Sequence, residues 1–367
     1  MNQPSGRKKK KKPSALSRLF ANKWVRWLIP LVIVAVLAAV LHAKVDFIKE
    51  GLGEVRSADP VGVAVTLLLS CLSLFAMGEV MRLLLAAGGT RTNLRHTTEL
   101  VFAANAWSTS FPGGQALATV LSFNTMRSWG ASVVLCSWQI VVSGTLSTMW
   151  LVCLGLAATF TLGASIPIWS LVPTLAIMCL LSALVYWATS HPRALARWAR
   201  RIIPKINRLL RREPAAGLDC ALEHIHQLDA VELSKGKFAT AATWSLANWA
   251  LDIAALIAAV GAVTGALPAL HAETNHTTIA GVVLAYVSSK IAGTVQATPG
   301  GLGPVEAALT ATLVAVGMTA VGAVGTVLVY RMMSLVGVTV IGWIVHAMVF
   351  ARRGVNAKTL AAEEPSR

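Results

Sequence analysis

Apolar runs of membrane-spanning length recur along the chain between residues 24 and 350. Because about 20 apolar residues cross the hydrocarbon core of a bilayer as an α-helix, these runs predict an all-α polytopic membrane protein. Two further apolar segments, residues 98–122 and 279–318, are interrupted by proline and glycine, so the pattern predicts about 6–8 transmembrane helices in all. The six uninterrupted runs are residues 24–43, 61–86, 131–162, 168–189, 238–263 and 319–350, and the last is long enough to be tilted or broken near Arg331.

The sharpest interruption is Thr298-Pro299-Gly300-Gly301-Leu302-Gly303-Pro304-Val305-Glu306. Proline cannot continue a helix, glycine permits unusual backbone angles, and a second proline suits the first position of a new helix. We therefore predict two half-helices, the second directing its free N–H groups into the membrane interior. Such breaks survive at that depth only where protein or a water-filled cavity receives them, which predicts a substrate-binding site. The alternative is that Glu306 only caps its own helix.

A second break, Ser110-Phe111-Pro112-Gly113-Gly114-Gln115, interrupts the segment at residues 98–122. Its Pro112-Gly113-Gly114 core repeats Pro299-Gly300-Gly301 at an offset of 299 minus 112, or 187 residues. Both copies are followed by a long apolar helix. We therefore predict an internal duplication with repeat halves at about 61–190 and 238–350, joined by a cytoplasmic connector at 191–237.

The distribution of basic residues indicates how these segments are threaded. The loop at residues 191–212 carries eight lysines and arginines, and it would lie outside the cell if residues 98–122 crossed the membrane. Basic loops strongly prefer the cytoplasmic side. We therefore predict a re-entrant broken-helix hairpin that enters from the cytoplasm and a second that enters from outside. Two such hairpins in inverted repeats would enclose a site near the bilayer midplane.

The chain has a formal net charge of +16, from 32 basic and 16 acidic residues. The basic residues cluster between apolar spans and at residues 7–12, so they indicate topology and contacts with anionic lipid headgroups, not a nucleic-acid partner. We expect residues 1–23 to be a disordered basic cytoplasmic tail, 24–352 the transmembrane domain, and 353–367 a second cytoplasmic tail. The protein is expected in the cytoplasmic membrane.

Ionisable residues inside apolar segments are costly and therefore candidates for substrate binding. The candidates are Glu79, Arg82, Asp252, Lys290, Glu306 and Arg331. The basic members could meet a lipid phosphate and the acidic members an amine. Structural ion pairs are the alternative, either Asp252 with Arg331 or Glu306 with Lys290. The first two candidates lie three residues apart on one helical face, where a local ion pair is equally plausible.

Metal and cofactor chemistry is not indicated by the sequence. The five cysteines form no metal or redox motif, and no disulfide is expected. The histidine pairs at residues 224 and 226 and at residues 271 and 276 lack the spacing of a strong metal site. A nucleotide-binding loop of the Gly-x-x-x-x-Gly-Lys type is also absent from the sequence.

These features together resemble the lysylphosphatidylglycerol synthase transmembrane region, also called the flippase-like domain family. The resemblance covers roughly residues 24–352 and rests on Pro299, Gly300, Gly301, Gly303 and Glu306, on Pro112, Gly113 and Gly114, and on Tyr330-Arg331. Gln115 and Ala116 stand where the family often has a further glycine and an acidic residue.

The resemblance implies a transporter that moves a phospholipid, an aminoacylated phosphatidylglycerol or a polyprenyl-linked lipid carrier between leaflets. The chain ends at Arg367 without the soluble aminoacyltransferase domain of full synthases, so we expect no enzymatic activity. Two alternatives stay open: a membrane-embedded lipid-modifying enzyme with Glu306 or Asp252 as base, and a non-transporting accessory subunit of envelope biosynthesis. A homo-oligomer is also open.

Overall fold

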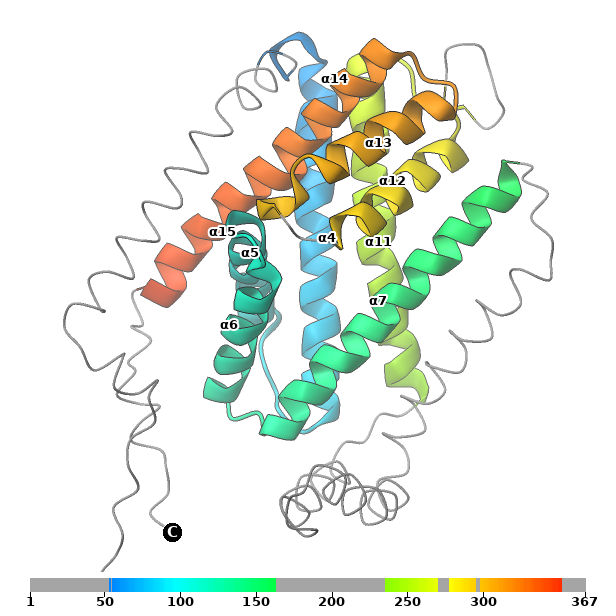
Figure 1. Ribbon diagram of the computed structural model, residues 1–367. Coiled ribbons are helices and arrows are strands. Elements are labelled where there is room, and N and C mark those ends of the chain that lie inside the picture. The colour runs from blue at the N-terminus through cyan, green and yellow to red at the C-terminus, as the bar shows by residue number, and fades with distance from the viewer. Residues whose placement is uncertain (1–52, 54, 163–234, 270–276, 295–297, 352–367) are drawn as a thin grey trace, which may run out of the picture. The chain divides into compact units, whose positions relative to one another are not determined.

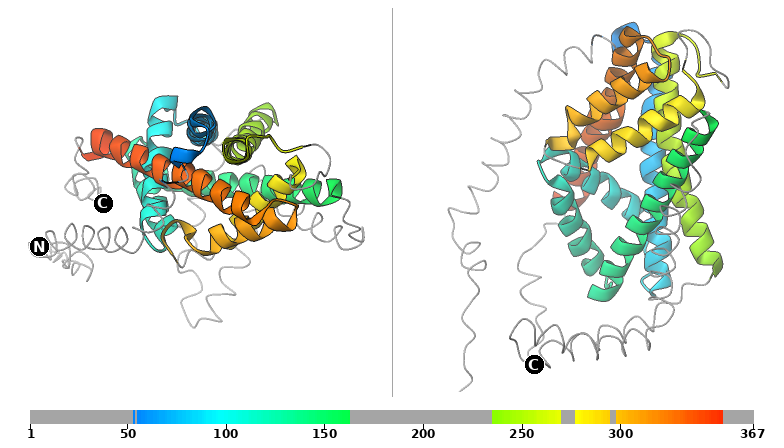
Figure 2. Two further views of the ribbon diagram at one scale, coloured as in Figure 1. Left: turned by 90° about the horizontal axis from the view of Figure 1, so that it is seen from above. Right: turned by 45° about the vertical axis from the view of Figure 1, so that its right-hand side comes forward.

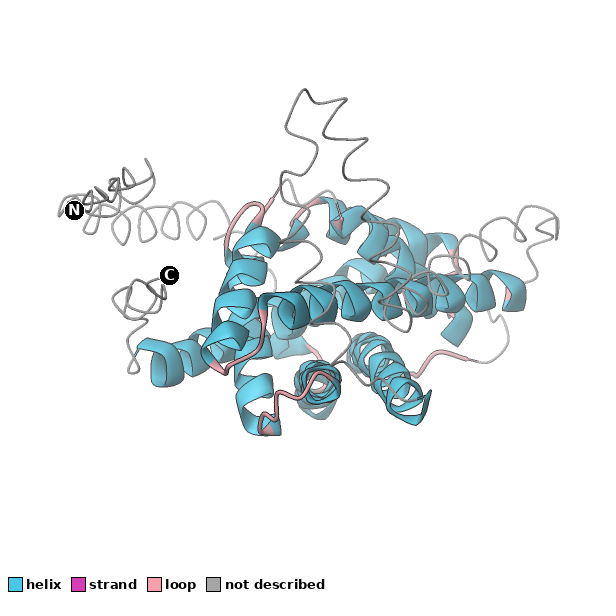
Figure 3. Ribbon diagram, turned by 90° about the horizontal axis from the view of Figure 1, so that it is seen from below, coloured by secondary structure: helices cyan, strands magenta, loops and turns pink. Residues whose placement is uncertain are grey.

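The computed structural model describes residues 53, 55–162, 235–269, 277–294 and 298–351. The chain divides into two units, Met1–Lys49 and Glu50–Arg367, and every described residue belongs to the second. Within the described ranges, every regular element is a helix (Figure 3). The predicted all-α class is therefore confirmed there, whereas the predicted tails, most of the connector and the spans at 24–43 and 168–189 lie outside the described residues.

In the part of the chain that the structure describes, four helical segments are long and apolar enough to cross a membrane: α4 (Pro60–Ala87), α7 (Val133–Thr161), the Gly236–Thr264 part of α11 (Lys235–Thr264), and the run Ala320–Val349. They correspond to four of the six predicted spans. The start of α4 is set by Asp59, whose Oδ2 accepts a 2.7 Å hydrogen bond from the Gly62 N–H, and by a proline at the first helical position.

Helices α4 and α11 lie side by side, as Figures 1 and 2 show. Near one end, a Cβ added at Gly62 would lie only 2.6 Å from the Cβ of Ala262, so the two helices approach closely. Further along, the Asn248 Nδ2 donates a 2.7 Å hydrogen bond to the Ser73 carbonyl. Inside a bilayer the hydrophobic effect does not drive helices together, so close packing at small residues and interhelical hydrogen bonds of this kind hold them in contact.

Each predicted hairpin consists of two short helices packed on one another: α5 (Leu94–Ser110) with α6 (Gly114–Ser128), and α12 (Ile279–Gly293) with α13 (Pro304–Ala315). These helices have 12 to 17 residues. At 1.5 Å per residue they are about 18–26 Å long, which is short of the hydrocarbon core of about 30 Å. The middle glycines of the two breaks, Gly113 and Gly300, both have a left-handed backbone conformation, with φ values of 63° and 62°.

The last apolar run is irregular where the sequence predicted a break. Helix α14 (Ala320–Arg331) passes into a wider π-helical turn, η2 (Met332–Gly337), before α15 (Val338–His346) and a second wide turn, η3 (Ala347–Ala351). Such π turns are rare and occur often at functional sites. The run is thus not broken at Arg331: it continues as a helix and widens into a π turn directly after that residue.

Helix α15 packs against α5 through Gly342. A Cβ at this glycine would lie 2.4 Å from the Phe102 carbonyl oxygen and 2.8 Å from the Ala106 Cβ. Because one neighbour is backbone, Gly342→Ala should force the helices apart and destabilise the fold by about 1–3 kcal/mol. The measurement is the thermal unfolding midpoint of the detergent-solubilised protein.

The matched control is Gly236→Ala, since nothing lies within 4 Å of a Cβ at that helical glycine. Alanine is the better helix former, so this variant should keep or slightly raise the midpoint. An equal midpoint for both variants would contradict the close α5–α15 contact.

Candidate functional site

A cavity of about 630 Å³ lies among the described helices, with lining residues from α4, α5, α6, α7, α11, α12 and the run from η1 (Pro299–Gly301) to α15. Small-molecule sites typically measure about 300–1,000 Å³. Both helix breaks reach this cavity: Phe111 and Gln115 flank the first, and Gly300 and Gly301 belong to the second. Two interrupted segments that are far apart in the sequence therefore contribute to one site.

The second break lies against the end of α5, directly before the first break, through Gly300. A Cβ at this position would lie 3.3 Å from the Thr109 carbonyl oxygen and 2.7 Å from the Leu335 Cδ1. The residue also has a left-handed backbone conformation that other residues rarely adopt. Glycine is thus required here both by backbone angle and by the space available.

The second break is closed by Glu306 and Arg331. The Glu306 Oε2 accepts a 2.6 Å hydrogen bond from the Gly303 N–H, while its Oε1 accepts a 2.5 Å bond from the Arg331 Nε. The Arg331 Nη2 donates a 2.6 Å bond to the Gly300 carbonyl. Glu306 therefore does cap its own helix, and it also forms an ion pair. Its predicted pairing with Lys290 was wrong.

A second cluster is centred on Asp252 in α11. Its carboxylate accepts hydrogen bonds from the Lys290 Nζ at 3.0 Å, the Tyr286 hydroxyl at 2.6 Å and the Tyr330 hydroxyl at 3.0 Å. The Lys290 ammonium also lies 4.7 Å from the centre of the Tyr286 ring, within the range of a cation–π interaction. The predicted alternative pair of Asp252 with Arg331 was therefore wrong, because each residue has a different partner.

The sequence did not predict that either tyrosine binds Asp252: Tyr330 was identified only through the family resemblance, and Tyr286 was not a candidate. The sequence signal was weak: the chain has only three tyrosines, and two of them lie in apolar segments that also hold a candidate charged residue. Tyrosine hydroxyls are rarely buried without a partner.

Some of the predicted site residues line the cavity and others do not. Glu79 and Arg82 pair with one another through two hydrogen bonds of 2.5 and 2.7 Å, as the local alternative stated, and neither lines the cavity. Pro112, Gly113 and Gly114 form the first turn without lining the cavity themselves, and Pro299 and Gly303 shape the second in the same way. Of the predicted residues, the cavity is lined by Asp252, Lys290, Gly300, Gly301 and Arg331.

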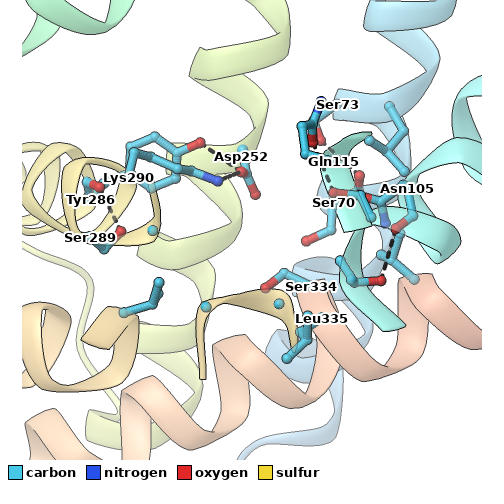
Figure 4. Close-up of a pocket in the computed structure, with 18 of the residues that line it drawn as sticks. Ser70, Ser73, Asn105, Gln115, Asp252, Tyr286, Ser289, Lys290, Ser334 and Leu335 are labelled. Atoms are coloured by element: carbon cyan, nitrogen blue, oxygen red, sulfur yellow. Dashed lines mark hydrogen bonds and ion pairs between the residues drawn. The ribbon is translucent and has the colours of Figure 1, made fainter. Parts of the chain in front are cut away.

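A set of uncharged polar side chains also lines the cavity, and sequence reasoning missed it. Figure 4 shows Ser70, Ser73, Asn105 and Gln115 across the cavity from Asp252 and Lys290. Serine and asparagine occur in many membrane helices, so only the fold reveals that these residues share a surface. Among the described residues, no group of three or more His, Cys, Asp or Glu side chains could hold a metal ion.

The apolar helices and the polar cavity between them define an integral membrane protein with an internal polar site. The family described as the lysylphosphatidylglycerol synthase TM region matches residues 27–342, so the chain belongs to this family. This makes it a membrane protein of lipid metabolism or transport. No curated protein matches the sequence.

The Glu306–Arg331 pair yields a stability prediction, since the side chains are only 17% and 10% exposed. Glu306→Ala removes both the cap and the counter-ion, leaving a buried guanidinium without its carboxylate. Breaking such a pair should cost about 3–5 kcal/mol and clearly lower the thermal unfolding midpoint. The double variant Glu306→Leu/Arg331→Leu should lose less than the sum of the two single variants.

The control is Arg95→Ala, at the pair Arg95–Glu99 in which the arginine side chain is 80% exposed. Exposed pairs contribute only about 0–1 kcal/mol, so this variant should unfold close to the wild type. Similar midpoints for Glu306→Ala and Arg95→Ala would show that the buried pair does not stabilise the break.

Proposed function

We propose that the protein moves a membrane lipid between leaflets by admitting its polar headgroup to the cavity while the acyl chains remain in the bilayer. The observation that carries this proposal is a cavity with polar lining at the junction of two breaks in otherwise apolar helices. The proposed cargo is a lipid such as a phospholipid, an aminoacylated phosphatidylglycerol or a polyprenyl-linked carrier.

The physical basis is the cost of moving polar groups through hydrocarbon. Moving an unpaired amide or hydroxyl from water into a medium that offers no hydrogen bonds costs several kcal/mol of free energy. Serine, asparagine and glutamine side chains on α4, α5 and α6 offer such bonds within the cavity. A headgroup that exchanges water for these partners would face a lower barrier than one crossing lipid alone.

We further propose that the two helix pairs are re-entrant hairpins in inverted repeats. Their short helices and the matching glycine conformations at Gly113 and Gly300 support this arrangement. The basic loop at residues 191–212 supports entry of the first pair from the cytoplasm, with both termini on that side. The site would then lie near the bilayer midplane.

A transport role accounts better for the carboxylates than a catalytic one. A general base needs a carboxylate free to take up a proton from the reacting group. Asp252 is held by Lys290 and two tyrosines, and Glu306 by Arg331 and the Gly303 N–H. The matched family region is the non-catalytic, flippase-like part of the synthases. We therefore propose that the protein is not an enzyme.

The test is lipid movement in liposomes that contain the purified full-length protein. Fluorescent lipids of several headgroups are placed in the inner and outer leaflets, and a membrane-impermeant quencher measures their exchange. Wild-type protein should accelerate exchange of at least one lipid. Gly144→Trp should reduce exchange to the rate of protein-free liposomes, because Gly144 lines the cavity and a Cβ there meets nothing within 4 Å.

The matched control is Gly236→Trp, at another open helical glycine that does not line the cavity. It should retain wild-type exchange. Mass spectrometry of the recovered lipids checks that none is chemically changed. Exchange that is absent for the whole lipid panel, or equal in the two tryptophan variants, would contradict transport through this cavity.

A further inference from the structure

The charged side chains that line the cavity or pair with a lining residue neutralise one another. Asp252 pairs with Lys290, and Arg331 pairs with Glu306, at 3.0 and 2.5 Å. Two acids and two bases sum to zero charge. A buried charge without a partner is strongly unfavourable. A charged ligand would therefore need a counter-ion, but each of these four side chains is already paired with another.

The uncharged side of the cavity has the opposite property, because its hydrogen-bonding groups are largely unused. The side-chain amide of Asn105 makes no hydrogen bond with any residue that the structure describes. The Gln115 Oε1 accepts a 2.9 Å bond from the Ser108 hydroxyl, whereas no described residue accepts from its amide N–H groups.

The same holds for three lining groups on other helices, taken over the described parts of the chain. The Ser70 hydroxyl has no hydrogen-bond partner although the residue is only 3% exposed. Asn248 donates to the Ser73 carbonyl, but its Oδ1 accepts from no described residue. The Ser147 hydroxyl is likewise unused in the described region. Free donors and free acceptors are thus both present.

This surface fits a particular ligand chemistry. A hydroxyl group both donates and accepts, and a carboxamide offers one acceptor and two donors in a fixed plane. Several amides and hydroxyls on neighbouring helices can therefore bind a ligand with several hydroxyl groups and no charge. Figure 4 shows Ser70, Asn105 and Gln115 of this surface across the cavity from Asp252 and Lys290, and all of its members line the cavity. A bound headgroup would therefore contact it directly.

We propose that the cavity accepts an uncharged, polyhydroxylated headgroup of the sugar type, carried on a lipid. This inference rests on the proposed function and specifies its cargo. The neutral wall, defined as Ser70, Asn105, Gln115, Ser147 and Asn248, recognises the hydroxyl groups. The paired charges stay paired and add no requirement for a charged ligand. A lysylated or a simple anionic phospholipid headgroup matches this surface less well.

The experiment measures lipid retention by the purified full-length protein. Detergent-solubilised protein is mixed with equal amounts of monoglucosyl diacylglycerol, phosphatidylglycerol and lysylphosphatidylglycerol of the same acyl chains, and bound lipid is counted by native mass spectrometry. The glucosyl lipid should be retained in preference to both others. Asn105→Leu should weaken its retention about fivefold, the effect of losing one neutral hydrogen bond.

A second variant and a control keep the test decisive. Gln115→Leu, at an exposed position of α6, should also weaken retention, and it carries the test if Asn105→Leu does not fold. The matched control is Asn124→Leu, an exposed residue of the same helix that does not line the cavity, and it should bind like the wild type. Folding is checked by the thermal unfolding midpoint of each variant.

The outcomes separate this inference from the proposed function. Preferential retention and transport of phosphatidylglycerol or its lysylated form would overturn the sugar-headgroup inference and leave lipid transport standing. Equal retention of the glucosyl lipid by the wild type, Asn105→Leu and Gln115→Leu would show that the neutral wall does not bind the headgroup. Methyl glucoside that binds as tightly as the glucosyl lipid would overturn carriage on a lipid. If the protein retained no lipid and exchanged none, the proposed function itself would be overturned.

Discussion

The structure depends on satisfying the polar groups that are released where an apolar helix breaks. At the second break, Arg331 donates to the Gly300 carbonyl and Glu306 accepts from the Gly303 N–H, and the two side chains also pair with each other. Each buried backbone group left unpaired would cost about 1–3 kcal/mol. Because Gly300 also packs against Thr109 of α5, the cluster that satisfies one break helps to position the other.

Local properties were predictable from the sequence, and relations between helices were not. The apolar runs predicted α4, α7, α11 and the last span, and proline and glycine predicted both breaks, because length and backbone freedom are properties of a short segment. The ion-pair partners were assigned wrongly because they depend on how helices are rotated. Lys290 reaches Asp252 across 38 residues, and composition alone does not rank it above Arg331. The neutral wall was missed for the same reason.

The two breaks share a backbone conformation but differ in chemistry. Gly113 and Gly300 have nearly equal φ values, yet the helix after the second break begins with an acidic cap, and the helix after the first carries Gln115. Ala116 stands at the third position of α6, where α13 has Glu306, so the first break has no acidic cap. The neighbouring Gln115 leaves its amide donors free of the described residues, whereas Glu306 accepts from the Gly303 N–H. Similar turns therefore provide one element that stabilises the fold and another that offers hydrogen bonds.

The strengths of the contacts around the breaks differ accordingly. The second break is held by charge-assisted hydrogen bonds, which are roughly twice as strong as neutral ones. The end of α5 is held to α15 by neutral bonds, from the Trp343 Nε1 to the Ser110 hydroxyl at 2.9 Å and between the Thr109 and Thr339 hydroxyls at 2.7 Å. The contact of the first helix pair with α15 thus rests on neutral hydrogen bonds, and α5 and α6 of this pair contribute Asn105 and Gln115 to the uncharged lining.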